Sequence, residues 1–126
     1  MERRHFVRIV RSVLDTLPPI FRDRIHNVAV LVEDYPPGER ARRRLRRRAP
    51  GSRGPRSLLM GVFVGVPATR KSVFDLPAGP DHIVLYQKNI EAVCSSPAEL
   101  RDEIRRTVIH ELGHYFGLDE DQLRDV

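Results

Sequence analysis

The chain of 126 residues is long enough for one domain with a modest hydrophobic core and too short for two. Its single cysteine, Cys94, excludes an intramolecular disulfide and is typical of a reducing compartment. No apolar run approaches the roughly 18 residues of a membrane span, and charged residues interrupt the apolar pattern at the N-terminus. We therefore expect neither a membrane segment nor a signal peptide, and the cytoplasm is the expected location.

The net charge of +5 comes from one segment. Residues 39–57 hold nine arginines and one glutamate, whereas the rest of the chain carries 13 basic and 16 acidic residues. Like charges repel, and few apolar groups are present to offset the entropy of ordering, so this pattern predicts a mobile loop. The alternative is a patch at Arg40–Arg56 that makes nonspecific contact with nucleic acid. No aromatic residue is interleaved to stack on bases, which counts against sequence-specific binding.

Helical patterns lie at the two ends of the chain. Residues 3–17 place apolar side chains at helical spacing ahead of a Pro-Pro pair, which predicts an amphipathic helix. A second helix is expected at about 97–116, with Ser96 as its N-cap and Gly117 as its left-handed stop. The apolar stripe that docks this second helix consists of Leu100, Ile104, Val108 and Leu112.

Three short β-branched runs predict strands between these helices, at Val28–Val32, Leu58–Val66 and His82–Tyr86. The first run is continuously apolar, so we expect it to be buried on both faces. The second contains Gly61 and Gly65, and glycine within a strand often marks a close approach of another backbone or a ligand. The order of elements predicts a single α+β domain over residues 1–126. It has a small mixed sheet of about three strands packed on the N-terminal and C-terminal helices.

The C-terminal helix carries the pattern His-Glu-x-x-His at residues 110–114. Residues four apart on a helix lie nearly above one another, so His110 and His114 can present two imidazole nitrogens to one ion. Glu111 lies close enough to reach a water on that ion without being a ligand. Two imidazoles, one further ligand and a water make an open zinc site, in which Glu111 acts as the general base. The alternative is a surface helix with solvated side chains, against which the apolar stripe and the end signals count.

The longer pattern His110-Glu111-x-x-His114-x-x-Gly117-x-x-Glu120 resembles the extended zincin motif. The chain is most similar to the small bacterial zincin-like metallopeptidases, or mini-zincins, through the stretches at residues 28–37, 61–67, 80–86 and 107–111. This resemblance implies a minimal zincin-like fold, a Zn²⁺ cofactor and a peptide or protein substrate. It also implies that Leu58–Val66 is the edge strand on which the substrate lies. The chain has no methionine after the motif, so the methionine turn of the metzincins is absent.

The resemblance places the third zinc ligand at Glu120, where the family has His or Asp. Asp119 and Asp121 flank it with the same chemistry on a shorter arm, so the choice among the three stays open. Glu120 is favoured, followed by Asp119. A further alternative is that all three carboxylates are solvated and a water fills the third position.

The sequence thus predicts a zinc metallopeptidase, with two rival functions. One is a metal-binding or peptide-interaction protein with weak or no catalysis, because only nine residues follow Gly117 to form the lower wall of a cleft. The other is an adaptor that binds nucleic acid through its arginine-rich loop.

Two tyrosines and three further histidines are less probable members of a site. Tyr86 and Tyr115 could donate to a developing oxyanion, although half-buried packing is the simpler interpretation. His5, His26 and His82 have no ligand spacing and are expected to be surface or structural residues.

Overall fold

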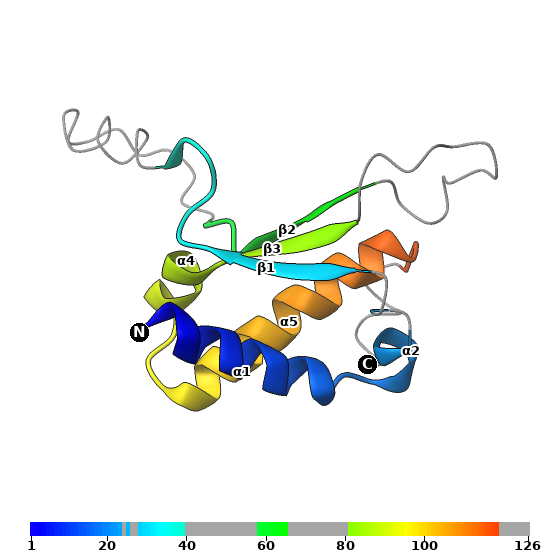
Figure 1. The fold of residues 1–126 in the computed structure, drawn as a ribbon, viewed down its shortest axis with the longest axis horizontal. Coiled ribbons are helices and arrows are strands. Elements are labelled where there is room, and N and C mark those ends of the chain that lie inside the picture. Colours follow the sequence, from blue (N-terminus) through cyan, green and yellow to red (C-terminus); the bar gives the residue numbers. More distant parts are fainter. Residues whose placement is uncertain (24, 26–27, 40–57, 66–80, 119–126) are drawn as a thin grey trace.

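Helices cover one face of a small sheet in the computed structural model (Figure 1). The structure describes residues 1–23, 25, 28–39, 58–65 and 81–118. The elements, in chain order, are α1 (Arg3–Asp15), α2 (Pro19–Arg22), β1 (Ala29–Glu33), β2 (Gly61–Val64), β3 (His82–Tyr86), α4 (Gln87–Ala92) and α5 (Pro97–Tyr115). This α+β arrangement confirms the predicted fold class.

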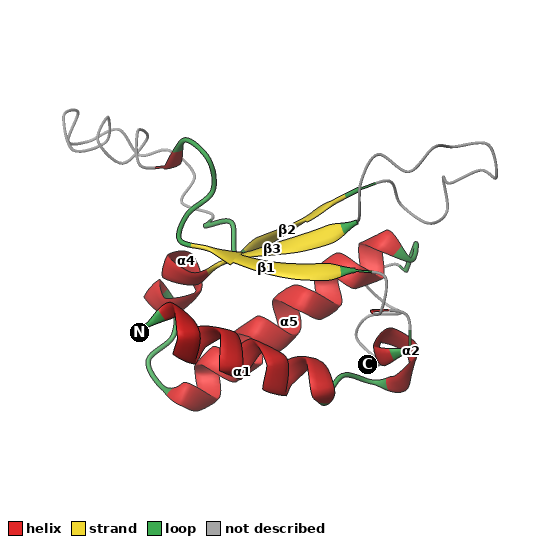
Figure 2. Cartoon of the chain, in the orientation of Figure 1, coloured by secondary structure: helices red, strands yellow, loops and turns green. Residues whose placement is uncertain are grey.

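The sheet has the strand order β1-β3-β2 and is mixed, as predicted (Figure 2). β3 is the central strand; it pairs with β1 in parallel and with β2 antiparallel. Ile83 of β3 is aligned with Val30 on one side and Phe63 on the other. Within the described residues, β1 and β2 are therefore the two edges of the sheet.

The core lies between the sheet and two long helices. α5 contacts α1, β2 and β3, and α1 and α5 lie on the same side of the sheet (Figure 1). The predicted apolar stripe of α5 is buried, which confirms that this helix is docked. The fully buried side chains include Phe6, Leu17, Phe21, Ile83, Leu85, Ile90, Ile104, Val108 and Leu112.

The expectation that the first strand is buried on both faces is wrong. β1 alternates between exposed and half-buried residues, and the Leu31 side chain is 46% exposed. The physical reason is its place in the sheet. β1 is an edge strand, and the helices pack against the face of the sheet opposite to Leu31, so one row of its side chains meets the core.

Local chemistry sets the start of α5. Ser96 Oγ accepts a hydrogen bond from Glu99 N at 3.2 Å, and the Glu99 carboxylate accepts one from Ser95 N at 2.6 Å. These two bonds satisfy amides at the open end of the helix, and Pro97 at the first turn has no amide to satisfy. The predicted N-cap is confirmed.

The end of α5 is a Schellman motif. Gly117 adopts φ of 78°, a left-handed conformation that favours glycine. Leu118 N donates to Gly113 O at 2.8 Å, and Gly117 N donates to His114 O at 3.1 Å. The predicted stop at Gly117 is confirmed, and it ends the helix directly after the turn that holds His114.

Gly61 allows β2 to lie against α5. A Cβ atom at this position would lie 2.9 Å from Thr107 Cγ2 and 3.0 Å from the Val84 carbonyl oxygen. The first contact is shorter than real Cβ atoms show and the second is at the tight limit, so a side chain here would force β2 or the Thr107 side chain to shift. The expectation of a close approach at Gly61 is confirmed, and the approaching group is the α5 helix.

The fully buried Asn89 joins two distant parts of the chain. Its Nδ2 donates to Glu39 Oε2 at 3.0 Å and to Leu59 O at 2.9 Å. Glu39 and Leu59 flank the predicted arginine-rich loop at 39–57, which, beyond Glu39, lies outside the described residues. The two chain segments that flank this loop are therefore held together by one α4 side chain.

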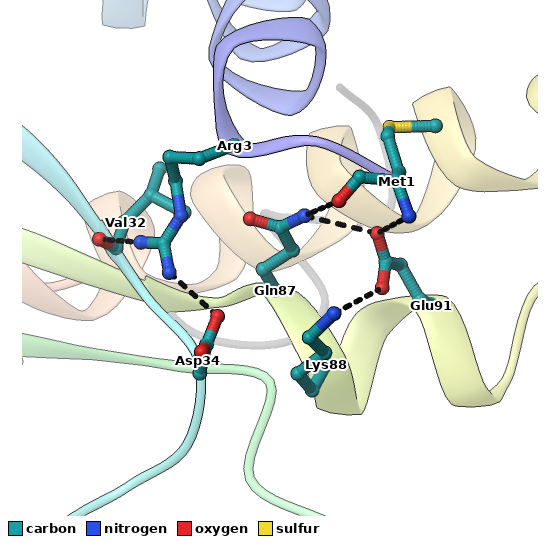
Figure 3. A network of polar contacts seen from close by, with 7 residues as sticks. All are labelled: Met1, Arg3, Val32, Asp34, Gln87, Lys88 and Glu91. Carbon is teal, nitrogen blue, oxygen red and sulfur yellow. Dashed lines mark hydrogen bonds and ion pairs between the residues drawn. The ribbon is translucent and has the colours of Figure 1, made fainter.

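A second polar cluster fixes the start of α1 (Figure 3). The Arg3 guanidinium donates to the Val32 carbonyl and to Asp34 Oδ1, the latter at 2.6 Å. The Gln87 amide donates to Met1 O at 2.8 Å. Side chains thus link the start of α1 to the end of β1 and to the start of α4.

We predict that the arginine-rich segment is dispensable for folding. Replacing residues 40–56 with a short Gly/Ser linker keeps Glu39 and Leu59, so the Asn89 bridge can still form. The far-UV circular dichroism and the melting temperature should be nearly unchanged. Asn89→Ala serves as the contrast, because it removes a fully buried side chain and its two hydrogen bonds and should destabilise the protein by about 1–3 kcal/mol. A large drop in melting temperature on linker replacement would mean that the segment packs on the domain.

We also predict that Gly61→Ala destabilises the protein by about 1–3 kcal/mol, because the added methyl overlaps Thr107 and the Val84 carbonyl. The melting temperature should fall by roughly 5 °C or more. Adding Thr107→Ser removes the overlapping Cγ2 and should restore part of the loss. Val64→Ala, at a 43% exposed side chain on the same strand, should be nearly neutral. A Gly61→Ala protein that melts like wild type would contradict this account of the contact.

Candidate active site

Two histidines converge on the outer side of α5. His110 and His114 are both exposed, and their Nε2 atoms lie 3.0 Å apart. Their rings are nearly perpendicular, with centroids 4.3 Å apart. The four-residue spacing therefore does what the sequence predicts, since it brings one nitrogen of each ring to a common point.

This pair fits the geometry of a zinc site. Ordinary Zn–N distances of about 2.0–2.1 Å in a tetrahedral site hold two nitrogens about 3.3–3.4 Å apart. The observed Nε2 separation differs from this by an amount that a small rotation of either ring supplies. Imidazole nitrogen is one of the ordinary zinc ligands in proteins, so the two side chains fit the predicted cofactor in type and spacing.

The candidates for the third ligand follow the end of α5. Glu120 and its alternatives, Asp119 and Asp121, lie outside the described residues. Within the described part of the chain, no group of three or more His, Cys, Asp or Glu side chains could hold a metal ion. The assignment of Glu120 therefore stays a prediction.

Glu111 points toward the edge of the sheet. Its side chain is half-buried, and Oε2 accepts a hydrogen bond from Phe63 N of β2 at 3.1 Å. The carboxylate thus adjoins His110 in sequence while it contacts a strand 48 residues away. Its position beside the histidine pair, without taking part in it, is the one expected for a general base.

The Glu111 contact shows which backbone groups of β2 face outward. Tyr86 N donates to Met60 O at 2.9 Å, so these two residues form a hydrogen-bonded pair of the antiparallel ladder. Such pairs alternate with non-bonded ones, so the backbone groups of Gly61 and Phe63 point away from β3. The observed part of the predicted strand Leu58–Val66 is therefore an edge strand, and its outward groups lie beside Glu111.

A groove of about 370 Å³ lies between β2 and α5. It is lined by Leu59, Met60, Gly61, Glu103, Arg106, Thr107, His110 and Glu111. The sequence analysis did not identify Glu103, Arg106 and Thr107 as groove residues. Helical spacing could have revealed them. Glu103 and Arg106 precede His110 by seven and four residues, and Thr107 precedes Glu111 by four, so they share a side of the helix with these residues. Glu103 and Arg106 form an ion pair at 2.8 Å.

The two candidate tyrosines have structural contacts. Tyr115 donates its hydroxyl to Asp81 Oδ2 at 2.9 Å, and its ring stacks on Phe63 with centroids 4.3 Å apart. Tyr86 is buried, and this burial, with a smaller effect of the Glu33 carboxylate, raises the pKa of its hydroxyl. These contacts favour the packing interpretation for both.

Cys94 has the environment of an inert thiol. Burial, followed by the nearby Glu103 and Glu99 carboxylates, raises the pKa of this half-buried side chain. A raised pKa lowers the thiolate fraction on which nucleophilicity depends. Both features indicate that Cys94 is a small packing residue rather than a nucleophile.

The three other histidines and the absence of an expected membrane segment remain to be compared with the structure. His5 is exposed on α1 and His82 lies half-buried on β3, whereas His26 lies outside the described residues. Among the described residues, no helix is both long enough and apolar enough to cross a membrane.

Comparison with known proteins identifies the family of this chain. The model of the zincin-like metallopeptidase family matches residues 25–126, and the chain belongs to that family. Among solved structures, a conserved hypothetical protein from Thermus thermophilus is similar in fold, with a TM-score of 0.56 and 23% sequence identity. The similarity covers 92% of this chain and 94% of that one. None of the curated proteins matches the sequence significantly.

We predict that the purified protein holds about one zinc ion per chain. His110→Ala and His114→Ala should each lose it, because one imidazole of the observed pair is removed. Zinc affinity of Glu120→Ala, Asp119→Ala and Asp121→Ala, measured side by side, then identifies the third ligand, with the largest loss expected for Glu120. Equal zinc content in wild type and both histidine variants would contradict the metal site. Loss in Asp119→Ala alone would move the third ligand by one residue.

Proposed function

We propose that this protein is a zinc-dependent metallopeptidase that hydrolyses peptide bonds. The observation that carries the proposal is the convergence of His110 and His114 beside Glu111, at the outward edge of β2. Membership of the zincin-like metallopeptidase family supports the same reaction class. The single cysteine suits the cytoplasm as its location.

His110 and His114 are the proposed zinc ligands, with Glu120 as the third. When bound, Zn²⁺ polarises the scissile carbonyl and lowers the pKa of a coordinated water to about 7. The two imidazoles bind the metal in their neutral forms. They are presented on the exposed side of a helix whose opposite side is buried, so the ligand pair rests on a fixed support.

Glu111 is the proposed general base. Its carboxylate takes a proton from the attacking water and then gives it to the leaving amine. The side chain adjoins His110 on the helix, so it can reach this water without displacing either imidazole.

The substrate is proposed to bind as an extended peptide along β2. The outward backbone groups of Gly61 and the outward carbonyl of Phe63 can add a strand to the sheet, and the groove between β2 and α5 can receive its side chains. This placement brings the peptide backbone to the side of the sheet where Glu111 lies.

Glu111→Gln tests this function. The variant should retain zinc and lose hydrolysis of an unfolded, casein-like protein by roughly 10²–10⁴-fold, because an amide cannot accept the proton. Asp102→Asn, which removes another carboxylate from α5 at an exposed position outside the groove, should keep wild-type activity.

Two other outcomes would contradict this function. Equal activity of Glu111→Gln and wild type would exclude Glu111 as the base. A zinc-loaded wild type that binds peptides without hydrolysing them would support the metal-binding or peptide-interaction function instead.

A further inference from the structure

We propose that the backbone amide of Phe63 is a positioning group for Glu111, so that the edge strand itself orients the catalytic base. This inference rests on the proposed function. In the part of the chain that the structure describes, Phe63 N is the hydrogen-bond donor that reaches the Glu111 carboxylate, at 3.1 Å from Oε2. The bond leaves the second carboxylate oxygen, Oε1, to take the proton.

The Phe63 amide is available because of the register of the sheet. Phe63 is aligned with Ile83 in a non-bonded pair, so its amide points away from β3 rather than into the ladder. An amide one residue earlier or later in β2 would donate to β3 and could not reach α5. The hydrogen bond between Phe63 and Glu111 therefore depends on the register of β2 against β3. A shift of one residue would turn the Phe63 amide toward β3 and abolish this bond.

Glu111 has reason to need such a donor. Its side chain has several rotatable bonds, and it is half-buried, where a carboxylate is destabilised unless hydrogen bonds compensate. A base must also be held close to one geometry to act efficiently. The amide of a strand that is paired to its neighbour is a fixed donor, because its position does not depend on a side-chain rotamer.

Phe63 is itself held by the helix that carries Glu111. Its ring stacks on Tyr115, with centroids 4.3 Å apart and planes at 24°. Tyr115 follows Glu111 by four residues and so lies on the same side of α5. The Tyr115 hydroxyl is bound to Asp81, next to β3. Two successive turns of α5 thus contact Phe63. Glu111 binds its backbone amide, and Tyr115 stacks on its ring.

This role differs from the use that a bound peptide would make of the same amide. An added strand would draw on the outward groups of β2, among which the Phe63 amide is already taken by Glu111. If the amide positions the base, its loss lowers kcat. If it binds the substrate, its loss raises KM and leaves kcat unchanged.

The experiment removes this one N–H group. An amide-to-ester replacement at Phe63 keeps the ring and deletes the donor, and Phe63→Pro deletes it genetically at a position where an edge strand tolerates proline. Phe63→Ala is the matched control for the proline variant, because it keeps the amide and loses the ring.

We expect kcat to fall roughly tenfold to a hundredfold for the ester relative to wild type, and for Phe63→Pro relative to Phe63→Ala. Zinc content should stay unchanged and KM should change less than about threefold, since the donor acts on the base. A rise in KM alone, or an unchanged kcat for the ester, would overturn the proposal.

A second measurement does not depend on activity or on zinc. Amide hydrogen exchange, measured by NMR on the metal-free protein, should show a protected Phe63 amide in wild type. In Glu111→Ala this amide should exchange at least about tenfold faster, because its acceptor is gone. The Val62 amide, which the register directs toward β3, should be unchanged and serves as the internal reference.

The two measurements separate the failure of each proposal. A protected Phe63 amide in a zinc-loaded protein without hydrolysis would refute the peptidase and would leave Phe63 with a structural bond only. Equal Phe63 exchange in wild type and Glu111→Ala would refute the positioning role, whatever the activity.

Discussion

The close approach of β2 to α5 is the constraint on which the candidate site depends. Gly61 allows it, because a side chain there would overlap Thr107 of the helix and the Val84 carbonyl of the central strand. Thr107 lies one helical turn before Glu111, and Gly61 lies two residues before Phe63 on β2. The same short separation therefore brings the Glu111 carboxylate within 3.1 Å of the Phe63 amide. The absence of a side chain at Gly61 thus sets the distance between Glu111, the proposed base, and β2.

The two sides of α5 have different roles. Ile104, Val108 and Leu112 are fully buried and attach α5 to the core, while His110 and His114 are exposed. Leu112 and His110 are two residues apart and so project to nearly opposite sides. Packing of the buried side fixes the rotation of the helix about its axis, and this rotation decides that the imidazoles face water and Glu111 faces β2. The proposed metal ligands therefore owe their fixed placement to the core beneath the helix.

The elements whose signals are local could be predicted from the sequence, and those that depend on distant contacts could not. Ser96 and Gly117 set the ends of α5 through bonds to residues within one or two turns, so short-range patterns reveal them. The exposure of Leu31 depends on β1 lying at an edge, a fact of topology that an apolar run does not contain. The histidine pair follows from spacing on one helix. The Glu111 contact spans 48 residues and needs the register between β2 and β3, which no local pattern encodes.

The two edges of the described sheet differ in the side chains that meet them, and this difference bears on the proposal that a peptide binds along β2. An edge strand presents unpaired backbone groups to which another strand can add. On β1, the Arg3 guanidinium occupies the Val32 carbonyl and also pairs with Asp34, which links this edge to the start of α1 (Figure 3). On β2, the side chain that meets the outward backbone is Glu111. A peptide added to β1 would lie three strand spacings, about 14 Å, from β2, the strand that Glu111 contacts. A peptide added to β2 would lie directly beside the Glu111 carboxylate, which is the proposed base. Glu111 already binds the Phe63 amide, so such a peptide would pair with the outward groups of Gly61 and with the Phe63 carbonyl.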